Sequence, residues 1–202
     1  PWFGSEYFKR IWNKDVTNAQ LSLSYQATED LILQGRASMI STNNNTELQS
    51  PKSYFNYSTS REGGYSLEQN DRLDIDYDFL AMYSKTITDN FGININAGAA
   101  SRYYRLTNSF AAADGLTVPG VHNLGNSKGP VTATNYLEKK AVNSVYGTIE
   151  FDLYNAFFLS FAGRNDWSSA LAKSQRSYFY PSASLSVVVS NLVEMPEQID
   201  YL

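Results

Sequence analysis

The stretch that looks most like a reaction centre is "FAGRNDWSSALAKSQRSYFYPSASLSVVVS", residues 161–190. Arg164, Asp166 and Trp167 lie almost side by side there, with two serines directly after them. A hydrolytic centre of the Ser-His-Asp type also needs an imidazole base. The only histidine is His122, in a separate polar segment, and the chain has no cysteine. The sequence therefore contains no His-based metal cluster or triad, and no Cys-ligated zinc, thiol catalysis or disulfide.

Three aspartates, Asp74, Asp76 and Asp78, form the other candidate, either as paired catalytic carboxylates or as a Ca²⁺ cluster. On a strand, positions i, i+2 and i+4 share one face but spread over about 13 Å. We interpret them as the polar face of a strand and expect no enzymatic activity and no cofactor. A β-rich glycan hydrolase using these carboxylates is the enzymatic alternative, and Asp→Asn changes would abolish its turnover.

Composition favours a surface that is half apolar and half wet. Aromatic residues make up 14% of the 202 residues, 15 of them Tyr, and charged residues make up 18%, against about 25% in soluble domains. A tyrosine has an apolar ring and a polar tip, so it suits such a boundary. The net charge is −4 and there is no run of Lys or Arg, so nucleic acid is excluded as a partner.

Apolar and polar residues alternate with a period of two over many segments, which indicates strands with two different faces. We expect the apolar positions to face lipid, and they include Leu21, Leu23, Leu73, Ile75, Ile93, Ile149 and Phe151. We expect the polar positions to face a wet lumen or a plug, and they are Asp74, Asp76, Asp78, Asn94, Asn96, Glu150 and Asp152.

About seven strands of roughly 10 residues are predicted, a length that fits a tilted crossing of a bilayer. Pairs of strands are joined by short turns, and long polar segments lie between the pairs. Long connections on one side and short ones on the other are typical of outer-membrane β-barrels. The strand pairs are 17–27/31–41, 72–86/91–104 and 142–153/157–166, and the polar segments are 42–71, 105–141 and 167–176.

The same alternation would also build a soluble β-sandwich or an adhesin-like binding module. Carboxylates such as Asp74 would be costly on the inner face of a soluble barrel, but the outer face of a sandwich could carry them. We keep this module as the alternative. Purification of a folded monomer from the aqueous fraction would favour it.

The opening stretch is then a strand, an outer hairpin loop and a returning strand. Arg164 and Asp166 could pair locally, and Trp167 would anchor the rim as in an aromatic girdle. The loop runs from Trp167 to Arg176. Pro181 in the returning strand suggests a bulge or a position near the upper end of the strand.

Several of these segments resemble the SusC/RagA-type TonB-dependent outer-membrane transporters of Bacteroidetes. The resemblance is carried by "GRNDWSSALAKSQRSYFYPSASLSVVVSNL" (163–192), by "KKAVNSVYGTIEFDLYNAFFLS" (139–160) and by "GLTVPGVHNLGNSKGP" (115–130). Members of that family typically show G-R-x-D-W-S-S followed by x-R-S-x-F-Y-P-S-x-S-x-S. The likeness covers most of the chain from about residue 17 onward.

The resemblance implies an all-β fold, a segment of an antiparallel transmembrane β-barrel of 22 strands closed by a plug. It also implies a bacterial outer-membrane importer of oligosaccharides or peptides, driven by the TonB complex through the plug and capped by a SusD-like surface lipoprotein. Other expected partners are outer-membrane lipid and the remaining segments of the same barrel. The family has no catalytic residues to carry over.

Nothing in the chain resembles the plug, a TonB box or a signal sequence. It opens "PWFGSEYFKR" and ends "EMPEQIDYL", and about seven strands cannot close a 22-stranded barrel. We therefore expect residues 1–202 to be an internal part of the β-barrel domain of a longer receptor, without the plug.

Overall fold

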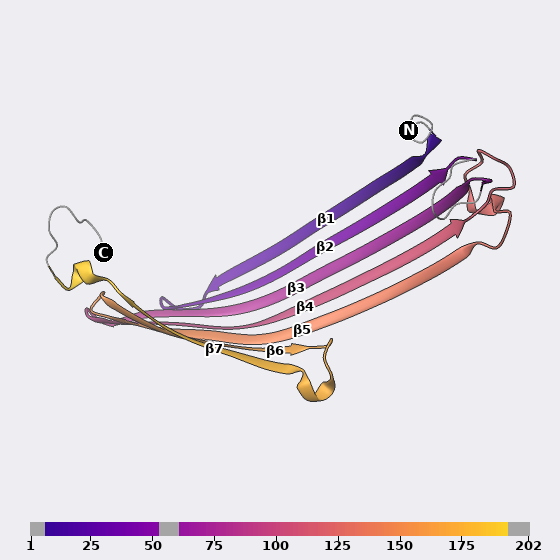
Figure 1. Cartoon of the computed structure of the whole chain (residues 1–202). Helices are drawn as coiled ribbons and strands as arrows, with labels where there is room; N and C mark the ends of the chain where they lie inside the picture. Colours follow the sequence, from indigo (N-terminus) through magenta and orange to yellow (C-terminus); the bar gives the residue numbers. More distant parts are fainter. Residues whose placement is uncertain (1–6, 53–60, 194–202) are drawn as a thin grey trace. The chain divides into compact units, whose positions relative to one another are not determined.

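The chain forms one β-sheet. The structure is a computed structural model, and it describes residues 7–52 and 61–193. Seven strands follow one another in the sheet in sequence order, β1-β2-β3-β4-β5-β6-β7 (Figure 1). The predicted all-β antiparallel fold and the number of strands are confirmed. The strands are β1 (Lys9–Gln26), β2 (Leu31–Ser50), β3 (Gly64–Thr88), β4 (Phe91–Ala113), β5 (Thr132–Leu153), β6 (Phe157–Ser168) and β7 (Ser177–Val187).

The described residues also include three short 3₁₀ turns, η1 (Leu124–Asn126), η2 (Lys173–Gln175) and η3 (Val189–Asn191). Over residues 7–52 and 61–193, no helix is long and apolar enough to cross a membrane.

Five of the strands are much longer than predicted. Strands β1 to β5 have 18 to 25 residues, and only β6 and β7, with 12 and 11, are near the expected length of roughly 10. The segment "STNNNTELQS" (41–50) shows why, because it is the second half of β2 yet, apart from Leu48, polar on both faces. Backbone pairing needs no apolar side chains, so alternation marks only the part of a strand with one apolar face.

The long loops are correspondingly shorter than predicted. The connection between β2 and β3 is 51–63 rather than 42–71, although residues 53–60 lie outside the described part of the chain. The connection between β4 and β5 is 114–131 rather than 105–141. The one between β6 and β7 is 169–176 rather than 167–176, because Trp167 and Ser168 belong to β6. The polar residues at both ends of the two expected loops are therefore strand residues.

The short turns are found where they were predicted. At the β5–β6 turn, Tyr154 and Asn155 have φ of 59° and 49°, and the Ala156 N–H donates to the Leu153 carbonyl at 3.1 Å. Two consecutive residues with positive φ are the geometry of a two-residue hairpin turn that matches the twist of the strands. Turns on neighbouring hairpins are also joined, because the Tyr154 N–H donates to the carbonyl of Asn90 at 2.8 Å.

The strands divide between two compact units. Unit 1 holds 1–19, 39–74 and 104–139, and unit 2 holds 20–38, 75–103 and 140–202, each considered over its described residues.

The sheet has almost no hydrophobic core of its own. Among the described residues, the only buried hydrophobic side chains are Ala112, Ala113, Leu116 and Ala156. A β-sandwich buries the inner faces of two packed sheets against each other, whereas the described residues form a single sheet. Both of its faces lack a covering layer within this part of the chain, so the soluble sandwich alternative is not supported.

Three of the four buried hydrophobic residues lie in unit 1, where the 114–131 loop is folded compactly. Leu116 is 1% exposed and bridges to Ser127. Asn126 braces the loop from inside, because its side-chain amide donates to the carbonyls of Val118 and Val121, both at 2.8 Å, and accepts from the Val118 N–H at 3.1 Å. His122 rests against the end of β2, with Nε2 3.3 Å from the Ser50 carbonyl oxygen.

Asn126→Ala should therefore open this loop. It removes three hydrogen bonds, each contributing about 0.5–1.5 kcal/mol, and we expect trypsin to cut the complete folded protein faster at Lys128. Asn123→Ala is the control, since it removes one side-chain bond, to the Gly125 N–H at 2.7 Å. Equal cleavage rates for the two variants would contradict the bracing role of Asn126.

Candidate functional site

Unit 2 contains a network of polar side chains on one face of the sheet. Side chains two residues apart on a strand point to the same face, and hydrogen bonds between strands identify which positions share it. They join even-numbered residues of β2, β3, β4, β5 and β6. This polar face contains all the residues predicted to face the lumen or plug that belong to unit 2.

Asp78 on β3 is the centre of the network. Arg36 on β2 donates to its Oδ1 from Nε at 3.0 Å and also from Nη2. Tyr146 on β5 donates its hydroxyl to the other carboxylate oxygen at 2.6 Å. One carboxylate thus joins β2 and β5, which are not neighbours of each other in the sheet.

Gly98 on β4 makes the Tyr146 contact possible. Strand β4 lies between β3 and β5, so the Tyr146 ring must pass over it to reach Asp78. A Cβ at position 98 would come within 2.5 Å of the ring Cζ and 2.8 Å of the Phe79 carbonyl oxygen. Because real Cβ atoms do not approach so closely, only glycine fits under this ring.

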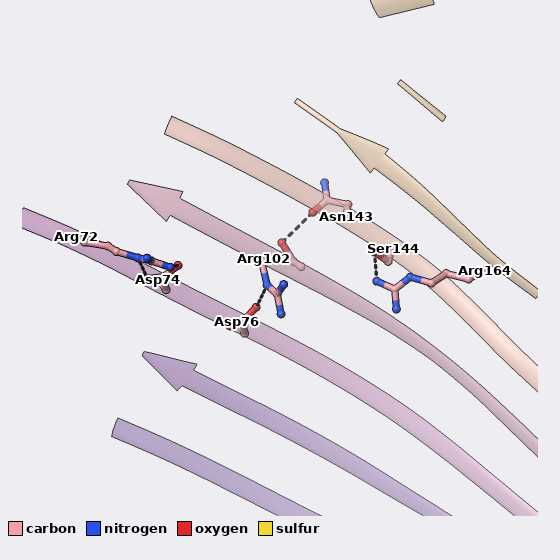
Figure 2. A network of polar contacts seen from close by, with 8 residues as sticks. Arg72, Asp74, Asp76, Arg102, Asn143, Ser144 and Arg164 are labelled. Carbon is pink, nitrogen blue, oxygen red and sulfur yellow. Dashed lines mark hydrogen bonds and ion pairs between the residues drawn. The ribbon is translucent and has the colours of Figure 1, made fainter. Parts of the chain in front are cut away.

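Arg164 extends the network to β6. Its Nε donates to Asp166 at 2.7 Å, which is the predicted local pair. Its Nη2 donates to the Ser144 hydroxyl at 2.9 Å (Figure 2). Its guanidinium carbon lies 5.7 Å from the centre of the Tyr146 ring, within the range of a cation–π contact. What looked like the start of a catalytic loop is a strand segment of this polar face.

The other predicted residues of unit 2 also have partners, with one exception. Asp76 accepts from Arg102 Nε at 2.6 Å (Figure 2). Asn94 accepts from Ser84 at 2.6 Å and donates to Glu150 at 3.3 Å, and Asn96 donates to Thr148 at 3.0 Å. Asp152 lies beside Gly92, and its Oδ1 is buried without a hydrogen-bond partner in the described part of the chain.

Unit 1 has its own polar cluster. Asp74 pairs with Arg72, two residues earlier on β3, at 2.6 Å (Figure 2). The guanidinium of Arg72 lies 5.2 Å from the Tyr104 ring centre. Asn108 on β4 donates to Glu68 at 3.0 Å and to Asn70 at 2.6 Å.

Trp167, Arg176 and Pro181 do not belong to the polar network. Trp167 is paired opposite Asn143 and Ser177 and is 42% exposed. Arg176 donates to the Leu171 carbonyl across the 169–176 loop at 3.3 Å. The bulge considered for Pro181 is wrong, since Pro181 pairs opposite Gly163 in an uninterrupted β6–β7 register. An antiparallel strand bonds each neighbour through alternate residues only, so a missing N–H on the far side leaves this pairing intact.

Ion pairs and hydrogen bonds between side chains brace the polar face. Each of the three candidate catalytic aspartates is held by an arginine. Over residues 7–52 and 61–193, no group of three or more His, Asp or Glu side chains could hold a metal ion. A polar hollow of about 500 Å³ opens on this face of unit 2 between Arg36, Arg102 and Arg164. Its arginines are 46–72% exposed, whereas Asp76 and Asp78 are 39% and 19% exposed, so the cationic side chains are more accessible than the carboxylates.

Known proteins were compared with this chain by family model, by sequence and by structure. No family model and no curated protein matches it. Solved structures of the RagAB peptide transporter do match. One superposes with a TM-score of 0.88 at 16% identity, over 97% of this chain and 22% of that chain.

Two other structures of the RagAB peptide importer give similar results, each at 16% identity. In the "open-open" state the TM-score is 0.86, over 95% of this chain and 21% of that one. In the "closed-closed" state it is 0.83, over 92% and 21%. This chain thus spans about a fifth of the chains it matches, and at this identity the similarity establishes the fold. The resemblance to SusC/RagA-type transporters is confirmed at that level: the chain has the fold of a β-barrel segment of the RagAB transporter.

Proposed function

We propose that this chain is part of the wall of a bacterial outer-membrane β-barrel that imports nutrients, either peptides or oligosaccharides. Residues 1–202 then belong to the barrel domain of a longer receptor whose other segments close the barrel. Peptides are the first candidate cargo because the matching RagAB structures are described as a peptide transporter.

The observation that carries the proposal is the difference between the two faces of one uncovered sheet. On the odd-numbered face of the unit 2 strands, large apolar side chains are 40–68% exposed; they are Leu21, Leu23, Tyr25, Tyr77, Phe79, Ile87, Val145, Phe161, Trp167, Phe179, Leu185 and Val187. The even-numbered face has the network of Arg36, Asp78, Tyr146 and Arg164. A barrel wall with lipid outside and a polar interior requires this distribution.

We further propose that the polar face of unit 2 meets the interior of the barrel or its plug. Import then draws on the TonB complex, acting through a plug outside this chain, and a SusD-like lipoprotein covers the extracellular side. The loops 51–63 and 114–131 are proposed to lie on that side, because they join the ends of strands opposite the short turns.

Deletion of the parent gene tests the function. We expect the deletion strain to stop accumulating either fluorescent peptides or fluorescent oligosaccharides, and the intact parent gene to restore uptake. Collapsing the proton gradient should abolish uptake as deletion does, because TonB-driven transport depends on it. Unchanged accumulation of both cargo classes in the deletion strain would refute the import function, and uptake that persists without a proton gradient would refute TonB driving.

A further inference from the structure

The apolar face of unit 2 contains a groove of about 580 Å³. Small residues, Gly35 and Ala37 on β2 and Ala99 on β4, line it together with larger side chains such as Leu23 and Phe79. A Cβ added at Gly35 would meet no atom within 4 Å. The groove is therefore open space above the small residues.

One end of this groove is polar. Ser101 on β4 donates its hydroxyl to the side-chain oxygen of Asn143 on β5 at 2.8 Å (Figure 2). Trp167 on β6 is paired directly opposite Asn143, and all three residues line the groove. A second polar pair lies on the same face of the next two strands, where Asn165 donates to the Ser177 hydroxyl at 2.9 Å.

We propose that the groove binds one acyl chain of lipid A, the acylated lipid of the outer leaflet, with the ester region of that lipid at Ser101, Asn143 and Trp167. The inference rests on the proposed placement of the barrel in a membrane, and not on the identity of its cargo. An indole has an apolar body and one N–H donor, so it suits the level where acyl chains end. The Asn143 side-chain NH₂ supplies further donors for ester oxygens, while its oxygen accepts from Ser101.

The groove fits a lipid better than a polypeptide because of what surrounds it. Exposed apolar side chains continue along the same face on both sides, from Leu21 and Tyr25 on β1 to Phe179 and Leu185 on β7. A peptide segment in the groove would leave this area bare, whereas lipid covers all of it. The ligand must also be apolar along its length and polar at one end, to match the lining.

The test is lipid retention by the complete transporter, purified after reconstitution with lipid A and measured by native mass spectrometry. Gly35→Leu and Ala99→Leu put a side chain into the groove. Ala183→Leu, on the same face of β7 but outside the groove, is the matched control. We expect both groove variants to hold the last bound lipid at least about tenfold more weakly, since two buried methylene groups contribute about that factor.

Asn143→Leu tests the polar end without filling the groove, and it should weaken retention of the same lipid. Heat-modifiable migration on a semi-native gel shows whether each variant still forms a barrel, and uptake by cells reports the proposed function separately. A folded Gly35→Leu or Ala99→Leu protein that keeps its lipid as Ala183→Leu does would overturn the proposal. Co-purification of a polypeptide in the groove of the unmodified protein, in place of lipid, would also overturn it.

Discussion

Gly98→Ala should destabilise the folded barrel by about 2.5–6 kcal/mol. The new methyl group collides with the Phe79 carbonyl oxygen and the Tyr146 ring, and overpacking of this kind costs about 1–3 kcal/mol. Displacing the ring also removes its hydrogen bond to Asp78, and such a bond to a charged group is worth about 1.5–3 kcal/mol. Urea unfolding of the complete barrel in lipid vesicles, followed by tryptophan fluorescence, measures the loss.

Gly35→Ala is the matched control, because a Cβ there meets nothing within 4 Å and should change stability by well under 1 kcal/mol. Tyr146→Phe separates the two contributions to the Gly98→Ala effect, since it keeps the ring and removes only the hydroxyl. The double variant Gly98→Ala/Tyr146→Phe should cost less than the sum of the single changes. Additive losses would show that the hydrogen bond survives in Gly98→Ala and that the ring does not depend on this glycine.

Leu185→Arg should block assembly of the barrel in the outer membrane, whereas Ser184→Arg should not. The two residues are neighbours on β7 and point to opposite faces, with Leu185 paired opposite Leu159 and Ser184 opposite Ser160. Leu185 is 65% exposed on the apolar face. An arginine on the lipid face of a barrel costs about 2–4 kcal/mol near the middle of the bilayer, and much less on the wet side.

The amount of heat-modifiable, folded protein in isolated outer membranes measures this difference. We expect the Leu185→Arg protein to be depleted at least about tenfold, which corresponds to 1.4 kcal/mol, and the Ser184→Arg protein to stay near the level of the unmodified one. The opposite ranking would mean that the face assignment of the sheet is reversed. Equal, normal amounts of both variants would contradict the placement of this strand in a membrane.

The alternation in the sequence was enough to predict an antiparallel all-β fold with seven strands and the positions of the three short turns. It also separated the apolar set containing Leu23 and Leu185 from the polar set containing Asp78. This works because side chains on a strand alternate with a period of two, which is a property of the backbone alone. The sequence alone therefore predicts whether two residues of one strand point to the same face of the sheet or to opposite faces.

The lengths of the strands were not predictable in the same way. The polar residues 41–50 belong to β2, although nothing in their pattern distinguishes them from a loop. The strands pair there through backbone groups, which do not depend on the type of side chain. The side-chain pattern therefore does not show where such a strand ends.

The partners across the sheet were decided by the tertiary structure. Arg36, Tyr146 and Gly98 are 42, 68 and 20 positions from Asp78 in the sequence, and none of the three stood out there. The sequence determined that Asp78 lies on the polar face, and only the register of four strands determined which residues surround it. Register depends on how whole strands align, which no single residue specifies. Gly98 on β4 then leaves the space through which Tyr146 on β5 reaches Asp78 on β3.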